Sequence, residues 1–127
     1  MPKRRRRCGT FFSKKMNANF IYRSSWEQSY FQFLDESNDV VSFYVEPFKI
    51  PYLYRKRVKN YIPDVLIKLK DKVMLVEIKP KKHVLKKVNQ AKFQAAKVSI
   101  KSLGIDEFIV LTEDDLRELG LFRKKSK

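Results

Sequence analysis

The segment that decides the fold is Tyr61–Lys79, which reads YIPDVLIKLKDKVMLVEIK. Its two apolar runs, Val65–Leu69 and Val73–Ile78, are rich in Val, Ile and Leu, residue types that favour β-strands. Each run is too short and too β-branched to indicate a helix. A charged turn at Lys70-Asp71 separates them. The segment therefore predicts a β-hairpin, although its turn lacks the Gly or Asn common at such positions.

Side-chain alternation along the two strands predicts the register of this hairpin. With the turn centred between its two charged residues, Leu66 faces Leu75 and Asp64 faces Glu77. One face is then wholly apolar, and it comprises Pro63, Val65, Ile67, Leu69, Met74, Val76 and Ile78. A slip of one residue would place Asp64 and Glu77 on opposite faces, so the hydrophobic pattern opposes it.

The charged end of the hairpin carries Asp64, Glu77 and Lys79 on one face. Two carboxylates directly opposite each other, with Cβ atoms roughly 5 Å apart, destabilise a sheet. A divalent cation between them would remove that cost, because hard cations such as Mg²⁺ bind carboxylate oxygens, water and phosphate. Lys79 would then meet an attacking water or a growing negative charge. The alternative is an ordinary ion pair between Asp64 and Lys79, with Glu77 solvated.

The composition bounds the class of protein. With 127 residues the chain fits one domain, and 43% hydrophobic residues are enough for a core. The 29 Lys and Arg outnumber the 14 Asp and Glu, which gives a net charge of +15 and indicates a polyanionic partner such as nucleic acid. A ribosomal or capsid-internal protein would have a similar charge. The single cysteine, Cys8, excludes an internal disulfide, and the single histidine, His83, argues against zinc.

The two ends of the chain are basic. No apolar run is long enough to cross a membrane, and no apolar segment follows the basic N-terminus as in a secretory signal. We expect a flexible arm over residues 1–20, a folded domain over residues 21–120 and a basic tail over residues 121–127. The arm holds a run of arginines that can lie along phosphates, Arg4, Arg5, Arg6 and Arg7. A solubilising tail or a nuclear-localisation-like run is the alternative.

Ser24–Glu36 predicts a helix, with a capping box formed by Ser24 at the N-cap and Glu27 at the third helical position. Taken alone, capping is the simpler explanation of Glu27. The same residue borders the apolar stripe of the helix, where a carboxylate needs a partner. A metal site at the open end of the hairpin would supply one.

The remaining pattern completes an α/β domain with a mixed central sheet flanked by helices. A basic loop over Arg55–Lys59 is expected to lead into the central hairpin. A helix over Val84–Leu103 ends at Gly104, and Thr112 caps the last helix. The other predicted elements are strands over residues 40–45, 48–54 and 108–111 and a helix over residues 113–119.

Pro63-Asp64 followed by Glu77-Ile78-Lys79 resembles the PD-(D/E)xK motif of the restriction-endonuclease-like nucleases. Further segments resemble one group of these enzymes in the same order: Tyr22-Arg23-Ser24-Ser25-Trp26-Glu27, Ile50-Pro51-Tyr52, Lys92-Phe93-Gln94-Ala95-Ala96 and Leu111-Thr112-Glu113-Asp114-Asp115-Leu116. That group is the TnsA-like endonucleases, and within it the small head-completion nucleases of tailed phages. The resemblance covers Tyr22–Gly120.

The resemblance implies a restriction-endonuclease-like fold, dependence on Mg²⁺ with Mn²⁺ as a substitute, and double-stranded DNA as the substrate. It assigns Glu27, Asp64 and Glu77 as the metal-binding carboxylates of the active site. The backbone carbonyl of Ile78 would be a further metal ligand. Lys79 would be the catalytic lysine.

The expected phosphate contacts lie outside this catalytic set. Lys92 matches a recurrent lysine on the following helix, although a solvated helix lysine is the alternative. The other expected contacts are Arg55, Arg57, Lys81, Lys82 and the N-terminal arm. The resemblance also implies a phage head or portal protein, or a second nuclease subunit, as partner, with the host cytoplasm and the virion as locations and no membrane.

Three functions fit these observations. The first is a Mg²⁺-dependent DNA endonuclease that processes DNA ends during phage head completion. The second is a catalytically silent DNA-binding virion or head-completion protein that retains a nuclease fold. The third is a basic RNA-binding or ribosome-binding domain, which would show no metal dependence.

Overall fold

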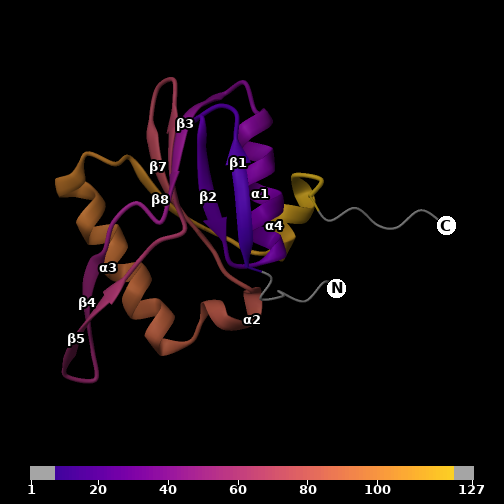
Figure 1. The fold of residues 1–127 in the computed structure, drawn as a ribbon. Helices are drawn as coiled ribbons and strands as arrows, with labels where there is room; N and C mark the ends of the chain where they lie inside the picture. Colours follow the sequence, from indigo (N-terminus) through magenta and orange to yellow (C-terminus); the bar gives the residue numbers. More distant parts are fainter. Residues whose placement is uncertain (1–7, 122–127) are drawn as a thin grey trace.

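The hairpin of residues 61–79 forms the centre of the sheet in the computed structural model, which describes residues 8–121 (Figure 1). Strands β6 (Val65–Leu69) and β7 (Val73–Ile78) pair antiparallel, with Leu66 opposite Leu75. The predicted register is therefore confirmed along the whole ladder. It exists because the alternating apolar residues reach one core only in this register.

A mixed four-stranded sheet is built around this pair, in the order β3-β6-β7-β8. β3 (Val40–Val45) lies antiparallel to β6, and β8 (Glu107–Leu111) lies parallel to β7. The crossover from β7 to β8 contains the short α2 (Lys81–Val84) and the long α3 (Lys87–Leu103). Gly104 ends α3 in the left-handed conformation, with φ 72°. The predicted α/β fold with a mixed sheet is confirmed.

The predicted apolar face of the central hairpin packs against the N-terminal elements. These are β1 (Gly9–Ser13), β2 (Ala18–Tyr22) and α1 (Ser25–Glu36), with α4 (Glu113–Glu118) beside them (Figure 1). The buried core on this side consists of Phe11, Trp26, Tyr30, Phe31, Leu34, Val40, Phe43, Val65, Ile67, Val76, Ile78 and Leu116. Burial of this apolar surface is what fixes α1 on the sheet.

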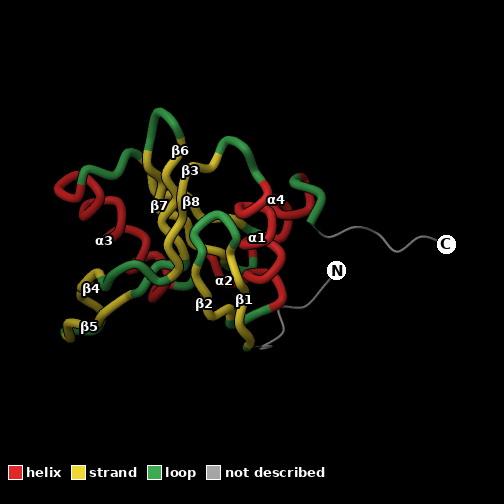
Figure 2. The backbone as a smooth tube through the Cα atoms, turned by 45° about the horizontal axis from the view of Figure 1, so that its top comes forward, coloured by secondary structure: helices red, strands yellow, loops and turns green. Residues whose placement is uncertain are grey.

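The opposite face of the sheet is covered by α3 and by a separate hairpin of β4 (Ile50–Tyr54) and β5 (Arg57–Tyr61). A second cluster of buried residues forms there: Ile50, Tyr52, Tyr61, Leu75, Ala96, Ile100 and Ile105. Figure 2 shows β4 and β5 beside α3, apart from the central sheet. On this face of β6–β7, Leu75 and Glu77 are buried, whereas Lys68 near the turn is exposed.

The expectation of a flexible arm up to residue 20 is wrong for its second half. β1 and β2 form a hairpin whose Phe11 and Ser13 side chains are buried. The Asp35 carboxylate on α1 holds the turn of this hairpin, because it accepts hydrogen bonds from the Lys14 and Lys15 amides. Arg4, Arg5, Arg6 and Arg7, and the tail from residue 122 onward, lie outside the described residues.

Two further expectations need correction. The basic loop over Arg55–Lys59 is a two-residue turn followed by strand β5, whose pairing with β4 overrides its low apolar content. The helix expected from Val84 is divided, because Leu85 and Lys86 separate α2 from α3. Among residues 8–121 the structure contains no helix long and apolar enough to cross a membrane.

Candidate active site

Asp64 lies immediately before β6, one position beyond the last paired residues of the ladder with β7. Its carboxylate accepts a hydrogen bond from the Ile78 amide at 2.6 Å, and its backbone carbonyl accepts one from the Glu46 amide at 2.8 Å. The Asp64 carboxylate thus takes the place of a backbone acceptor at the point where β6 and β7 separate. This contact holds Asp64 against the end of β7 that carries Glu77.

Glu77 and Lys79 lie on the same face of the chain at the end of β7. The Lys79 ammonium is 3.5 Å from a carboxylate oxygen of Glu77, and the two side chains are 17% and 7% exposed. The Lys79 amide donates to the Leu111 carbonyl of the parallel strand β8. The ion pair that forms is therefore Glu77–Lys79, and not the Asp64–Lys79 pair considered as the alternative.

Tyr61 extends the site beyond the residues expected from the sequence. Its side chain is buried at the end of β5. Burial raises the pKa of the Tyr61 hydroxyl, and the negative charges of Glu77 and Asp64 raise it further. The hydroxyl therefore stays protonated, and among the described residues it is a buried donor without a hydrogen-bond partner. No spacing in the sequence indicated this role, because β5 was read as a loop.

Lys92, on α3, reaches the same site from the other side. Its ammonium lies 6.0 Å from the centre of the Tyr52 ring and 5.8 Å from that of Tyr61. Burial lowers the pKa of Lys92, and the positive charge of Lys79 lowers it further, whereas Glu77 acts in the opposite direction. Two lysines therefore stand beside Glu77. Lys92 is thus not simply a solvated helix lysine.

The capping box expected from Ser24 and Glu27 forms only in part, because the Glu27 carboxylate binds the amide of Arg23, the residue before the N-cap. Ser24 is the N-cap of α1, and its hydroxyl accepts a hydrogen bond from the Glu27 amide at 3.2 Å. The Glu27 carboxylate accepts one from the Arg23 amide at 2.8 Å and is 3% exposed. Among residues 8–121 no three Asp, Glu, His or Cys side chains are gathered as a metal-binding group. The structure brings together Asp64 and the Glu77–Lys79 pair, and places Glu27 at the start of α1.

Two contacts fix the segments next to the site. Arg23 forms an ion pair with Glu46 at 2.6 Å, and the amide of Glu46 is the donor to Asp64. Glu46 has a positive φ of 49°, a conformation disfavoured for residues other than glycine, so these bonds hold a strained position. On the other side, the buried carboxylate of Glu113 accepts a hydrogen bond from the Lys81 amide. The chain is thus anchored both before β6 and after β7.

The expected phosphate-binding residues lie around this centre. Arg55 and Arg57 are exposed at the tip of the β4–β5 hairpin, where the Arg55 guanidinium lies 5.3 Å from the centre of the Tyr54 ring. Lys81 forms an exposed ion pair with Asp114 at 2.9 Å, and Lys82 is exposed beside it. The expected phosphate-binding cations are thus exposed on two elements, α2 and the tip of the β4–β5 hairpin.

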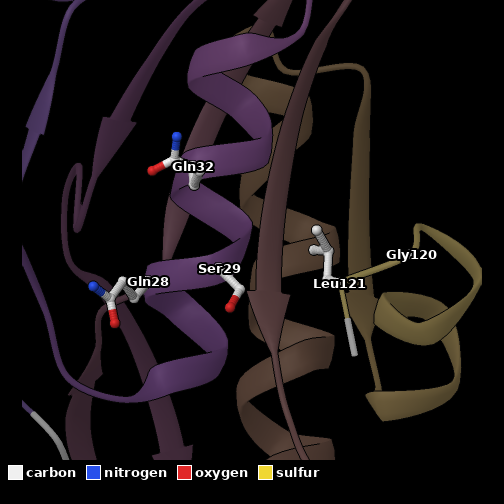
Figure 3. Close-up of a pocket in the computed structure, with 5 residues that line it drawn as sticks. All are labelled: Gln28, Ser29, Gln32, Gly120 and Leu121. Carbon is white, nitrogen blue, oxygen red and sulfur yellow. The ribbon is translucent and has the colours of Figure 1, made fainter. Parts of the chain in front are cut away.

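An open hollow beside α1 is lined by none of these residues. It is lined by Gln28, Ser29 and Gln32 of α1 and by Gly120 and Leu121 (Figure 3). The lining has no acidic or basic side chain. The expected site residues therefore lie at the ends of β6 and β7, and none of them lines this hollow.

Comparison with known proteins identifies the family. A family profile described as "TnsA-like endonuclease N terminal" matches residues 37–113, which contain Asp64, Glu77 and Lys79. The chain belongs to the TnsA-like endonucleases. The head completion nuclease of Enterobacteria phage T4 is 32% identical to this TnsA-like endonuclease over 124 residues, covering 78% of this chain and 82% of the relative. Glu27 lies outside the segment matched by the profile.

The donor set of this TnsA-like endonuclease fits a hard divalent cation. Asp64 and Glu77 offer carboxylate oxygens from neighbouring strands, which is the ligand type that Mg²⁺ prefers. Mg²⁺ characteristically uses one or two protein carboxylates and keeps several waters, so a third carboxylate is not required. The residues that would hold the ion are therefore Asp64 and Glu77.

Proposed function

We propose that this protein is a Mg²⁺-dependent endonuclease that hydrolyses phosphodiester bonds in double-stranded DNA. The observation that carries the proposal is the junction of Asp64, Glu77 and Lys79 at the parting ends of β6 and β7, within the segment matched by the TnsA-like family. The net charge of +15 supports a polyanionic substrate.

Each residue of the site has a distinct task in this proposal. A bound Mg²⁺ supplies Lewis acidity and acidifies a water molecule. Asp64 and Glu77 would hold the ion, and the Ile78 carbonyl would be a further ligand. Lys79 orients the attacking water or stabilises the charge that grows on the phosphate. Lys92, held over two tyrosine rings, binds a neighbouring phosphate.

Glu27 is proposed as an additional carboxylate of the active site beside its capping role. Its carboxylate is buried and borders the core side of α1. Arg23, whose amide binds Glu27, is linked through Glu46 to the backbone of Asp64. A second cation held in part by Glu27 would stabilise the leaving oxygen.

The biological setting is proposed from the phage relative. The T4 protein is named a head completion nuclease. We infer that this protein processes DNA ends during completion of a phage head, in the host cytoplasm and in contact with head or portal proteins or a second nuclease subunit. Incorporation into the virion is part of the same proposal.

Plasmid cleavage tests the enzymatic proposal. Supercoiled DNA is incubated with the protein in Mg²⁺, Mn²⁺ or EDTA, and nicked and linear products are quantified. We expect cleavage in Mg²⁺ and Mn²⁺ only. We expect Lys79→Ala and Asp64→Asn each to lower the rate by about 10²–10⁴-fold, the usual contribution of an acid–base group. Asn keeps an acceptor for the Ile78 amide, so Asp64→Asn removes charge with little change in the strand contact.

An exposed lysine on α3 provides the matched control. Lys101→Ala removes one positive charge on the far part of the helix and should cleave at the wild-type rate. Cleavage in EDTA, or unchanged cleavage by the two site variants, would contradict the site. DNA binding without Mg²⁺-dependent cleavage would instead identify a catalytically silent DNA-binding component of the phage head.

A further inference from the structure

The β4–β5 hairpin has two faces with different surroundings. On the inner face, Ile50, Tyr52 and Tyr61 are buried against α3. On the outer face, Leu53 and Val58 are directly opposite each other in the ladder and are 67% and 74% exposed. An exposed apolar patch that is rimmed by charged residues commonly marks a contact surface.

The charge around this pair has one sign. Residues 47–61 contain no Asp or Glu, and their cations are Lys49, Arg55, Lys56, Arg57 and Lys59. Arg55 and Lys56 form the two-residue turn with positive φ values of 51° and 63°. Such turns favour Asn-Gly, because residues with a Cβ are strained at positive φ. The two charged residues of this turn therefore make it less stable than a turn of Asn-Gly would be.

One end of the β4–β5 hairpin lies next to the proposed active site. Its base includes Tyr61, which lies beside Glu77, whereas its tip points away from the central sheet in both views (Figures 1 and 2). The tip lies about 13 Å from Tyr61 along the strand, from the rise of about 3.3 Å per residue. The major groove of B-DNA is about 12 Å wide and admits a two-stranded β-ribbon. A ribbon of this reach is therefore long enough to enter the major groove of a duplex whose backbone lies at the proposed site.

We propose that the β4–β5 hairpin enters the major groove of duplex DNA, with the Leu53–Val58 pair against the base edges and the tip cations on the flanking phosphates. The inference rests on the proposed DNA substrate and adds the element that engages the groove. Aliphatic side chains in the major groove contact thymine methyl groups, and Arg and Lys contact phosphates on both sides. The hairpin would thus position the duplex for cleavage at the base of the ribbon.

Two hairpin variants separate groove contact from folding. Leu53→Thr with Val58→Thr removes the apolar pair and retains residues that favour strands. Arg55→Asn with Lys56→Gly removes two charges and supplies the favoured turn, so its melting temperature should equal or exceed the wild-type value. Affinity for a fluorescent 30-bp duplex is measured by anisotropy in EDTA, where no cleavage occurs.

We expect the apolar variant to bind about tenfold more weakly, from the loss of buried methyl and methylene groups. We expect the turn variant to lower the slope of log affinity against log salt by about 2, since each cation releases about one counterion. The matched controls are Val41→Thr, an exposed strand residue of β3, and Lys97→Gln with Lys101→Gln on α3. Both controls should bind within about twofold of the wild type, because their residues are exposed and lie outside the hairpin.

A competition experiment identifies the groove. Methyl green occupies the major groove and should displace the wild-type protein, whereas netropsin occupies the minor groove and should not. Hairpin variants that bind like the controls, or displacement by netropsin alone, would overturn the inference. The binding measurements need no catalysis. Weaker binding by the hairpin variants would therefore support the groove contact even if the protein failed to cleave plasmid DNA. If the protein cleaved DNA normally and the hairpin variants bound like the wild type, the proposed enzymatic function would hold and only the groove contact would be rejected.

Discussion

The β6–β7 and β4–β5 hairpins have similar backbones but differ in how far their side chains are buried. Both are antiparallel pairs with a charged turn that lacks glycine. In β6–β7, Val65, Leu75 and Ile78 are each fully buried, because the sheet is covered on both faces. In β4–β5 only the inner face is buried, and Leu53 and Val58 stand in solvent. The first hairpin is fixed by the core, and the second by one face packed on α3. The buried hairpin thus carries the proposed active site, and the projecting hairpin is available to a partner.

The largest expected difference between the two hairpins is in how much a substitution lowers the free energy of unfolding. Ile67→Ala removes a side chain that is 1% exposed on β6 and should lower the free energy of unfolding by about 2–5 kcal/mol. Leu53→Ala on β4 should change it by at most about 0.5 kcal/mol, since the side chain is exposed. Urea denaturation followed by circular dichroism measures both. Equal losses would show that the outer face of β4–β5 is buried in solution.

A smaller effect tests whether the two hairpins share one site. Tyr61→Phe removes the hydroxyl beside Glu77 but keeps the ring under Lys92. Loss of one hydrogen-bonding group costs about 1 kcal/mol, so the cleavage rate should fall about fivefold with unchanged DNA affinity. Tyr52→Phe keeps the other ring under Lys92 and serves as the control. Equal rates in both variants would separate β5 from the catalytic centre.

The β1–β2 hairpin gives a third case, in which a single carboxylate supports the turn. Although burial raises the pKa of Asp35, hydrogen bonds from Ser13, Lys15 and Lys14 outweigh it, and the net shift is downward. A lowered pKa in the folded state adds stability above the unfolded value of 3.8, which is lost as pH falls through the folded value. Acid unfolding of the wild type should therefore be steeper below that value than acid unfolding of Asp35→Asn. Parallel acid profiles of melting temperature would contradict this role.

The central hairpin could be predicted from the sequence because residues close together in the chain determine its pairing. Alternation in Val65–Leu69 and Val73–Ile78 favours one register, which gathers the apolar side chains of both strands on one face and brings Asp64 to the end of β7. The same logic predicted the caps at Ser24 and Thr112, which satisfy backbone groups within one turn. Where neighbouring residues decide the structure, a single sequence was sufficient.

The elements that were missed depend on partners distant in the sequence. β1 lies in a basic region without clear periodicity, and its Ser13 is buried because Asp35 accepts a hydrogen bond from it. β5 contains mostly polar residues and becomes a strand by pairing with β4. Tyr61 and Lys92 meet only because β5 and α3 cover the same face of the sheet. None of these contacts can be recognised from the sequence pattern of either segment alone.

The hydrogen bond from the Ile78 amide to the Asp64 carboxylate has an evolutionary consequence. An acceptor lost from a buried amide costs about 1–3 kcal/mol, a large fraction of the stability of a small domain. A change of Asp64 to a residue without an oxygen therefore weakens the fold as well as removing the proposed metal ligand. Selection for a folded chain alone would retain this residue, even in a descendant that no longer cuts DNA.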